Sequence, residues 1–192
     1  MPSTVLVRGA NTSVSKALPS VSNITIGFSW DVVHGNGPAT EIVACAIVCG
    51  QDGKAVTDEH VVFFNQLLDP DEGVLYDESG NLPGGDAEQI EVSVGAIPSN
   101  VARIAFVLYV NPDLRRPGTF DSMRDAAVRV LDRSGDEFIR YPIDTKDKEL
   151  GATSAMLAAE LYRRGDEWKF RAVGQGYVGG VRDVAKDFGF TI

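Results

Sequence analysis

Short apolar runs of strand length, each followed by a turn signal, constrain the fold more than any other feature of this sequence. In residues 24–30, Ile, Ile, Phe and Trp alternate with Thr, Gly and Ser, as in a strand with one buried face. Residues 42–48 and 104–110 are nearly continuous apolar runs, which are typical of strands buried on both faces. About nine such runs separated by Gly, Pro, Asn and Asp predict an all-β sandwich of two packed sheets.

Two later segments predict β-hairpins, and the chain ends in a predicted helix. Residues 126–143 have Ser-Gly-Asp at their centre, and residues 155–173 have Arg-Gly-Asp. The composition of residues 155–164 also suits a helix, but the tight turn and the alternation after it favour strands. Apolar residues at 181, 184, 185 and 188 predict a short C-terminal helix that stops at Gly189.

Length and charge limit the classes of function. The 192 residues, of which 44% are hydrophobic, suffice for the core of one domain spanning 1–192. The formal net charge of −9 disfavours nucleic acid and anionic membranes as partners and favours a cation. The apolar runs are too short to cross a bilayer, and the first residues do not resemble a secretion signal. We therefore expect a cytoplasmic protein with no membrane insertion.

The cysteines and histidines do not predict a zinc or catalytic site. Cys45 and Cys49 lie on one face of a predicted strand, roughly 13 Å apart, which is too far for a disulfide. They are predicted to be buried thiols in a reducing compartment. His34 and His60 are distant from both in the sequence and are predicted to be surface loop residues.

Residues Gly174–Gly179 match the pattern G-x-G-x-x-G of dinucleotide-binding proteins. Only residues 180–192 follow, which leaves no room for the second strand and the acidic residue that bind the ribose. We interpret the segment as a glycine-rich turn that lets the last helix pack on the sandwich.

An acidic stretch, Asp69–Glu88, is the best candidate for a functional site. It contains no Lys, Arg or His, and its Gly and Pro residues favour an adaptable loop. Carboxylates on such a loop suit a hard cation such as calcium. The alternative is a solvated acidic loop between two strands. The seven carboxylates are Asp69, Asp71, Glu72, Asp77, Glu78, Asp86 and Glu88.

The stretch does not match the helix–loop–helix calcium motif. Counting from Asp77, Ser79, Asn81 and Glu88 occupy positions 3, 5 and 12, but Leu82 stands where the motif requires glycine. The flanking segments are also predicted strands rather than helices.

Six motifs are distinctive: GFSWD (27–31), FFNQL (63–67), DAEQIEV (86–92), IAFVLYV (104–110), ELYR (160–163) and EWKFRAVGQGYVGG (167–180). Through them the chain resembles the TerD family of bacterial tellurite-resistance and stress-response proteins, from about Ile24 to Gly189. The resemblance implies a β-sandwich that binds calcium through an acidic loop.

Carried over position by position, the resemblance implies calcium ligands at Asp31, Glu41, Asn81, Asp86 and Glu88. The chain also departs from the family pattern. Gly80, Ala87 and Val43 stand where the family has acidic residues, and the loop between Asn81 and Asp86 is about three residues short. Asp77 and Glu78 are candidates to compensate from one turn upstream, while Asp69–Glu72 is interpreted as solvated.

We therefore expect a non-enzymatic, TerD-like stress-response protein that binds calcium through its acidic loops, with other stress-response proteins as further candidate partners. The alternative is a divergent member that has lost the metal and acts as an interaction module in a stress-response complex. An enzyme is a distant third, because no nucleophile motif or histidine pair accompanies the carboxylates.

Overall fold

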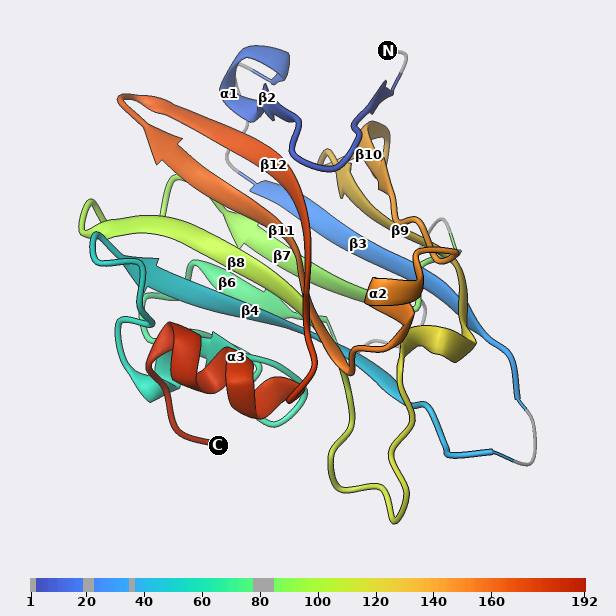
Figure 1. Ribbon diagram of the computed structural model, residues 1–192. Helices are drawn as coiled ribbons and strands as arrows, with labels where there is room; N and C mark the ends of the chain where they lie inside the picture. Colours follow the sequence, from blue (N-terminus) through green and yellow to red (C-terminus); the bar gives the residue numbers. More distant parts are fainter. Residues whose placement is uncertain (1–2, 19–22, 35–36, 78–84) are drawn as a thin grey trace.

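The computed structural model describes residues 3–18, 23–34, 37–77 and 85–192. Two six-stranded sheets pack face to face, and a short helix, α3 (Val181–Phe188), lies on the outer face of one of them (Figure 1). This confirms the predicted all-β sandwich with a C-terminal helix.

The first sheet has the strand order β1-β10-β9-β3-β7-β6. Its pairs are antiparallel except for the edge strand β1, which runs parallel to β10. Its strands are β1 (Thr4–Val5), β3 (Asn23–Val32), β6 (Val74–Tyr76), β7 (Glu88–Ser93), β9 (Met123–Leu131) and β10 (Glu137–Pro142).

The second sheet has the order β2-β12-β11-β8-β4-β5, and all its pairs are antiparallel. Its strands are β2 (Asn11–Ser13), β4 (Ile42–Gly50), β5 (Val61–Val62), β8 (Val101–Val110), β11 (Ala155–Arg164) and β12 (Glu167–Tyr177). Short helical turns are α1 (Val14–Ala17), η1 (Asp58–His60), η3 (Phe120–Ser122) and α2 (Lys148–Gly151).

The core between the sheets follows from the period-2 pattern. Ile24, Ile26 and Phe28 of β3 are buried, and the ring of Phe28 lies 6.2 Å from that of Phe106 in β8. Burial of each such side chain contributes roughly 1.5–3 kcal/mol to stability. The sheets are therefore held together by the alternating residues that predicted them.

The outer face of the second sheet is also buried, which explains the unbroken apolar run in β4. Cys45 and Ile47 point to this face, where Val184 and Phe188 of α3 cover them. The helix ends at Gly189, whose φ of 71° is left-handed, as the sequence predicted. A strand with both faces covered cannot alternate between apolar and polar residues.

Both predicted hairpins are present, as β9–β10 and β11–β12. The prediction of a glycine-rich turn at 174–179 is wrong in its first half, because Gly174 lies within β12. Gly174 has a φ of +68° at a β-bulge, and a Cβ there would lie 2.5 Å from the hydroxyl of Tyr141. Glycine is favoured both at a β-bulge within a strand and at a turn, so the sequence alone does not distinguish the two.

The two cysteines are free and buried, as predicted. Burial raises the pKa of Cys45 to about 12 and that of Cys49 to about 11. Both side chains are therefore protonated thiols at neutral pH and weak nucleophiles. Within the described residues, no helix has both the length and the apolar character needed to cross a membrane.

Candidate metal centre

The predicted ligands that the structure describes gather at one end of the sandwich. Asp31 lies near the end of β3, Asp77 follows β6, Glu41 precedes β4 and Glu88 opens β7. Glu88 pairs with Phe28 of β3, and the amide of Asp77 donates to the carbonyl of Gln89 at 3.0 Å. Residues from four segments of the chain thus meet where these strands begin or end.

Glu88 joins the two sheets at this end. Its carboxylate accepts a hydrogen bond of 2.6 Å from the amide of Ala44 in β4, and it also bonds the hydroxyl of Tyr76. Burial raises the pKa of Glu88 to about 7, and the negative charge of Glu41 adds to the rise. The hydrogen bonds from Ala44 and Tyr76 lower the pKa of Glu88, but by less than burial raises it. Glu88 is thus a half-buried carboxylate whose negative charge is incompletely compensated.

Asp86 already has a cationic partner. One of its oxygens lies 2.7 Å from Nη2 and 2.9 Å from Nε of Arg129 in β9, and the other accepts from Gln89 at 2.8 Å. The carboxylate lies over Gly27, where a Cβ would come within 2.1 Å of it. A metal ion at Asp86 would have to share these oxygens with Arg129 or displace its guanidinium.

The other predicted ligands are more exposed. Glu41 accepts a hydrogen bond of 3.2 Å from the side-chain amide of Asn111, and Asp31 is exposed opposite Arg124 of β9. Asp77 is partly buried. Asn81 lies outside the described residues, as does Glu78.

The chemistry of this donor set fits a hard cation, because every described member is a carboxylate. Its geometry fits only in part. In the described part of the chain, three His, Cys, Asp or Glu ligand atoms lie within 4.8 Å of one another in one group alone, His60, Asp69 and Asp71. The predicted calcium ligands share one end of the sandwich without forming such a trio.

In the first half of the acidic stretch, Asp71 and Glu72 are exposed, as predicted for a solvated loop, but Asp69 is not. Asp69 is buried, and its Oδ1 accepts hydrogen bonds from the amides of Gly73 at 2.7 Å and Val74 at 2.6 Å. This carboxylate closes a tight turn in which Glu72 has a φ of 57°. Strand β6 follows directly, and its three residues were too few to indicate a strand.

The prediction that His60 is a surface residue is also wrong. It is only 6% exposed, its Nδ1 lies 2.8 Å from the hydroxyl of Thr57, and its Nε2 lies 3.3 Å from Asp71. The signal in the sequence was its place directly before the apolar run that forms β5, which packs near β6.

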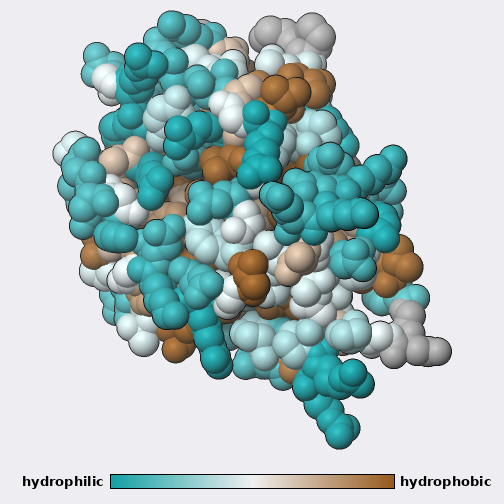
Figure 2. Space-filling model, viewed as in Figure 1, coloured by the Kyte–Doolittle hydropathy of each residue, from teal (hydrophilic) through white to brown (hydrophobic). Residues whose placement is uncertain are grey.

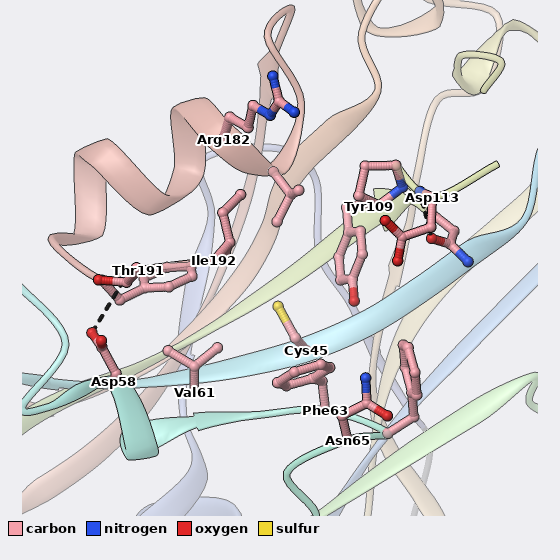
Figure 3. Close-up of a pocket in the computed structure, with 15 residues that line it drawn as sticks. Cys45, Asp58, Val61, Phe63, Asn65, Tyr109, Asp113, Arg182, Thr191 and Ile192 are labelled. Carbon is pink, nitrogen blue, oxygen red and sulfur yellow. Dashed lines mark hydrogen bonds between the residues drawn. The ribbon is translucent and has the colours of Figure 1, made fainter. Parts of the chain in front are cut away.

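A pocket of about 430 Å³ opens on the outer face of the second sheet, beside α3 (Figure 3). Cys45, Val61 and Tyr109 line it, and the amide of Thr191 donates to Asp58 at 3.1 Å along one side. Because the Cys45 thiol is protonated at neutral pH, the pocket has no activated sulfur nucleophile there.

The face shown in Figure 2 is largely hydrophilic, with apolar side chains in separate small groups. Of the exposed large apolar residues of the described chain, Val5 and Leu75 lie in strands of the first sheet and the others lie outside the strands. They include Val5, Val7, Val33, Phe64, Leu68, Leu75, Val178 and Ile192.

The sequence matches a known protein family over most of its length. Residues 3–188 match the TerD domain. Over 189 residues, covering 97% of each chain, the sequence is 35% identical to the tellurium resistance protein TerD of Serratia marcescens. It is 30% identical over 192 residues to general stress protein 16U of Bacillus subtilis, again covering 97% of each chain.

The fold has counterparts among solved structures. The crystal structure of a homologue of telluride resistance protein (TerD) from Streptomyces coelicolor superposes with a TM-score of 0.61 at 20% sequence identity. The match covers 82% of this chain and 91% of that one. At this identity the likeness establishes the sandwich fold alone.

Proposed function

This chain belongs to the TerD family, and we therefore propose that it acts in the response to tellurium compounds or related stress as a non-enzymatic calcium-binding protein. The names of its relatives, tellurium resistance protein and general stress protein, support the stress role. The protonated, buried state of both thiols supports a function without a catalytic cysteine. Free thiols also favour a cytoplasmic location.

The observation that carries the calcium proposal is the environment of Glu88. Its carboxylate lies between the two sheets with Glu41 close enough to raise its pKa, and Asp77 and Asp31 lie at the same end. Calcium takes six to eight oxygen ligands and neutralises clustered carboxylates. Glu88, Glu41, Asp77 and Asp31 are the described residues that would hold it.

The test is a calorimetric titration of chelator-treated protein with calcium, in wild type and in Glu88→Gln. We expect binding to the wild type and much weaker binding to the variant, which keeps the size of the side chain but loses its charge. Glu91→Gln, an exposed change of the same kind on the same strand, serves as the control and should bind as wild type does. Equal affinities for all three proteins would rule out a site at Glu88.

A second candidate is an interaction module that has lost the metal, and the ion pair between Asp86 and Arg129 favours it. An arginine neutralises one carboxylate that the family resemblance assigned to calcium, so part of the site has a substitute cation. This candidate predicts no heat of calcium binding up to millimolar concentration, together with a protein partner recovered in pull-down experiments.

A further inference from the structure

His60, Asp69 and Asp71 form a cluster at the opposite end of β6 from the proposed calcium ligands. One ligand atom from each residue lies within 4.8 Å of those of the other two. His60 ends the η1 turn before β5, while the two aspartates belong to the tight turn before β6. We propose that these three side chains bind a divalent first-row transition metal ion, with zinc as the best fit.

The spacing of the donor atoms is compatible with a shared zinc ion as well as with a long hydrogen bond. Nε2 of His60 lies 3.3 Å from Oδ2 of Asp71. Two ligand atoms each about 2.1 Å from a tetrahedral zinc ion lie roughly 3.4 Å apart. Hydrogen bonds between nitrogen and oxygen are usually shorter, at about 2.7–3.2 Å. The pair is thus already separated by about the distance that a shared ion requires.

The histidine is held as metal-binding histidines usually are. Its side chain is 7% exposed, and the hydroxyl of Thr57 lies 2.8 Å from Nδ1. When Nδ1–H donates to Thr57, the lone pair of Nε2 points toward Asp71. Ligating histidines commonly donate their other ring N–H to an oxygen in this way, which fixes the tautomer and the ring orientation.

The carboxylate of Asp69 is held equally firmly. Its Oδ1 is fixed by the amides of Gly73 and Val74, while its Oδ2 accepts one longer hydrogen bond, of 3.2 Å, from the amide of Asp71. Asp69 is buried, so its position does not depend on solvent. An ion at the cluster would therefore find two of its three ligands already ordered.

The charge and the solvent exposure of the cluster determine which metal ion it would bind. Two carboxylates balance the charge of a divalent ion, and the imidazole nitrogen selects zinc and its neighbours over calcium and magnesium. The side chain of Asp71 is 36% exposed, which leaves one side of the cluster open to solvent. A water molecule could complete the coordination there, as in zinc sites with three protein ligands.

The test is titration of the chelator-treated full chain with zinc alone and, separately, with cobalt. We expect one zinc ion per chain and, with cobalt, visible absorption bands of a site with nitrogen and oxygen ligands. His60→Gln and Asp71→Asn should each abolish both signals. Thr57→Val should weaken zinc binding by about 10- to 100-fold, because it removes the oxygen beside Nδ1. His34→Gln alters the other histidine, which is exposed, and should change nothing.

Asp71→Asn alters a partly exposed side chain and decides the question even if His60→Gln fails to fold. Zinc binding that is equal in folded Asp71→Asn and wild type would overturn the proposal, as would wild type that binds no zinc. In either case the contact between His60 and Asp71 is structural only. Glu88→Gln should keep its zinc, so this result is independent of the calcium experiment.

Discussion

At the scale of single residues, Glu88 couples the stability of the fold to pH. Burial raises its pKa from the ordinary value of 4.5 to about 7 in the folded protein, so the folded state binds the proton more tightly than the unfolded state. The stabilisation is complete below pH 4.5 and is lost as the pH rises through 7. Its size is roughly 3.5 kcal/mol, from about 1.4 kcal/mol per pKa unit.

We therefore predict that Glu88→Gln removes this pH dependence. In the presence of a chelator, the variant should gain stability relative to wild type as the pH is raised from 4.5 to 8, as measured by urea unfolding. Glu91→Gln, on the same strand but exposed, should follow the wild-type curve. Parallel curves for wild type and Glu88→Gln would show that Glu88 titrates normally.

The ion pair between Asp86 and Arg129 leads to a second prediction about single residues. The carboxylate is fully shielded from solvent and the arginine nearly so, and breaking such a pair leaves an uncompensated charge. We expect Asp86→Ala to lower the free energy of unfolding by about 3 kcal/mol. Asp86→Ala combined with Arg129→Ala should lose less than the sum of the single variants. Strict additivity in this double-mutant cycle would show that the pair contributes nothing.

At the scale of elements, α3 closes the outer face of the second sheet. Phe188 is buried against this face, and the guanidinium of Arg103 lies 5.2 Å from the centre of its ring. We predict that Phe188→Ala destabilises the protein by about 3–5 kcal/mol, because it leaves a cavity over β4 and β8. It should also make Cys49 react faster with a thiol reagent. Phe64→Ala, at an exposed ring, is the control and should have a much smaller effect on both measurements.

The elements also show how far the sequence could predict the structure. Alternation predicted β3, continuous apolar runs predicted β4 and β8, and the spacing at 181–188 predicted α3. Each pattern reflects which side chains of one segment are buried, so it can be recognised from the sequence of that segment alone. The bulge at Gly174 was not predicted, and the contact that a side chain there would make with Tyr141 of the other sheet leaves no local pattern in the sequence.

The site was less predictable than the fold for the same reason. The pairing of Asp86 with Arg129 joins β9 to the segment before β7, and the contact of His60 with Asp71 joins η1 to a turn. Neither contact produces a periodic pattern in the sequence, because each depends on how separate segments of the chain pack together. The family resemblance indicated which carboxylates are candidate ligands, but not which of them have other partners.

At the scale of the whole molecule, the proposed calcium ligands come from four segments and both sheets. They are together only in the folded chain, so calcium should bind the folded state and stabilise it. At about one hundred times the dissociation constant the gain is roughly 2.7 kcal/mol. For a chain of this size, that corresponds to a rise in melting temperature of roughly 5–10 °C.

The most direct test is the melting temperature of chelator-treated protein as calcium is added to millimolar concentration. We predict a saturable rise of this size in wild type and a much smaller rise in Glu88→Gln. A wild-type melting temperature that does not change over the whole range would contradict the calcium proposal, and would leave the interaction module as the better description of this TerD-family protein.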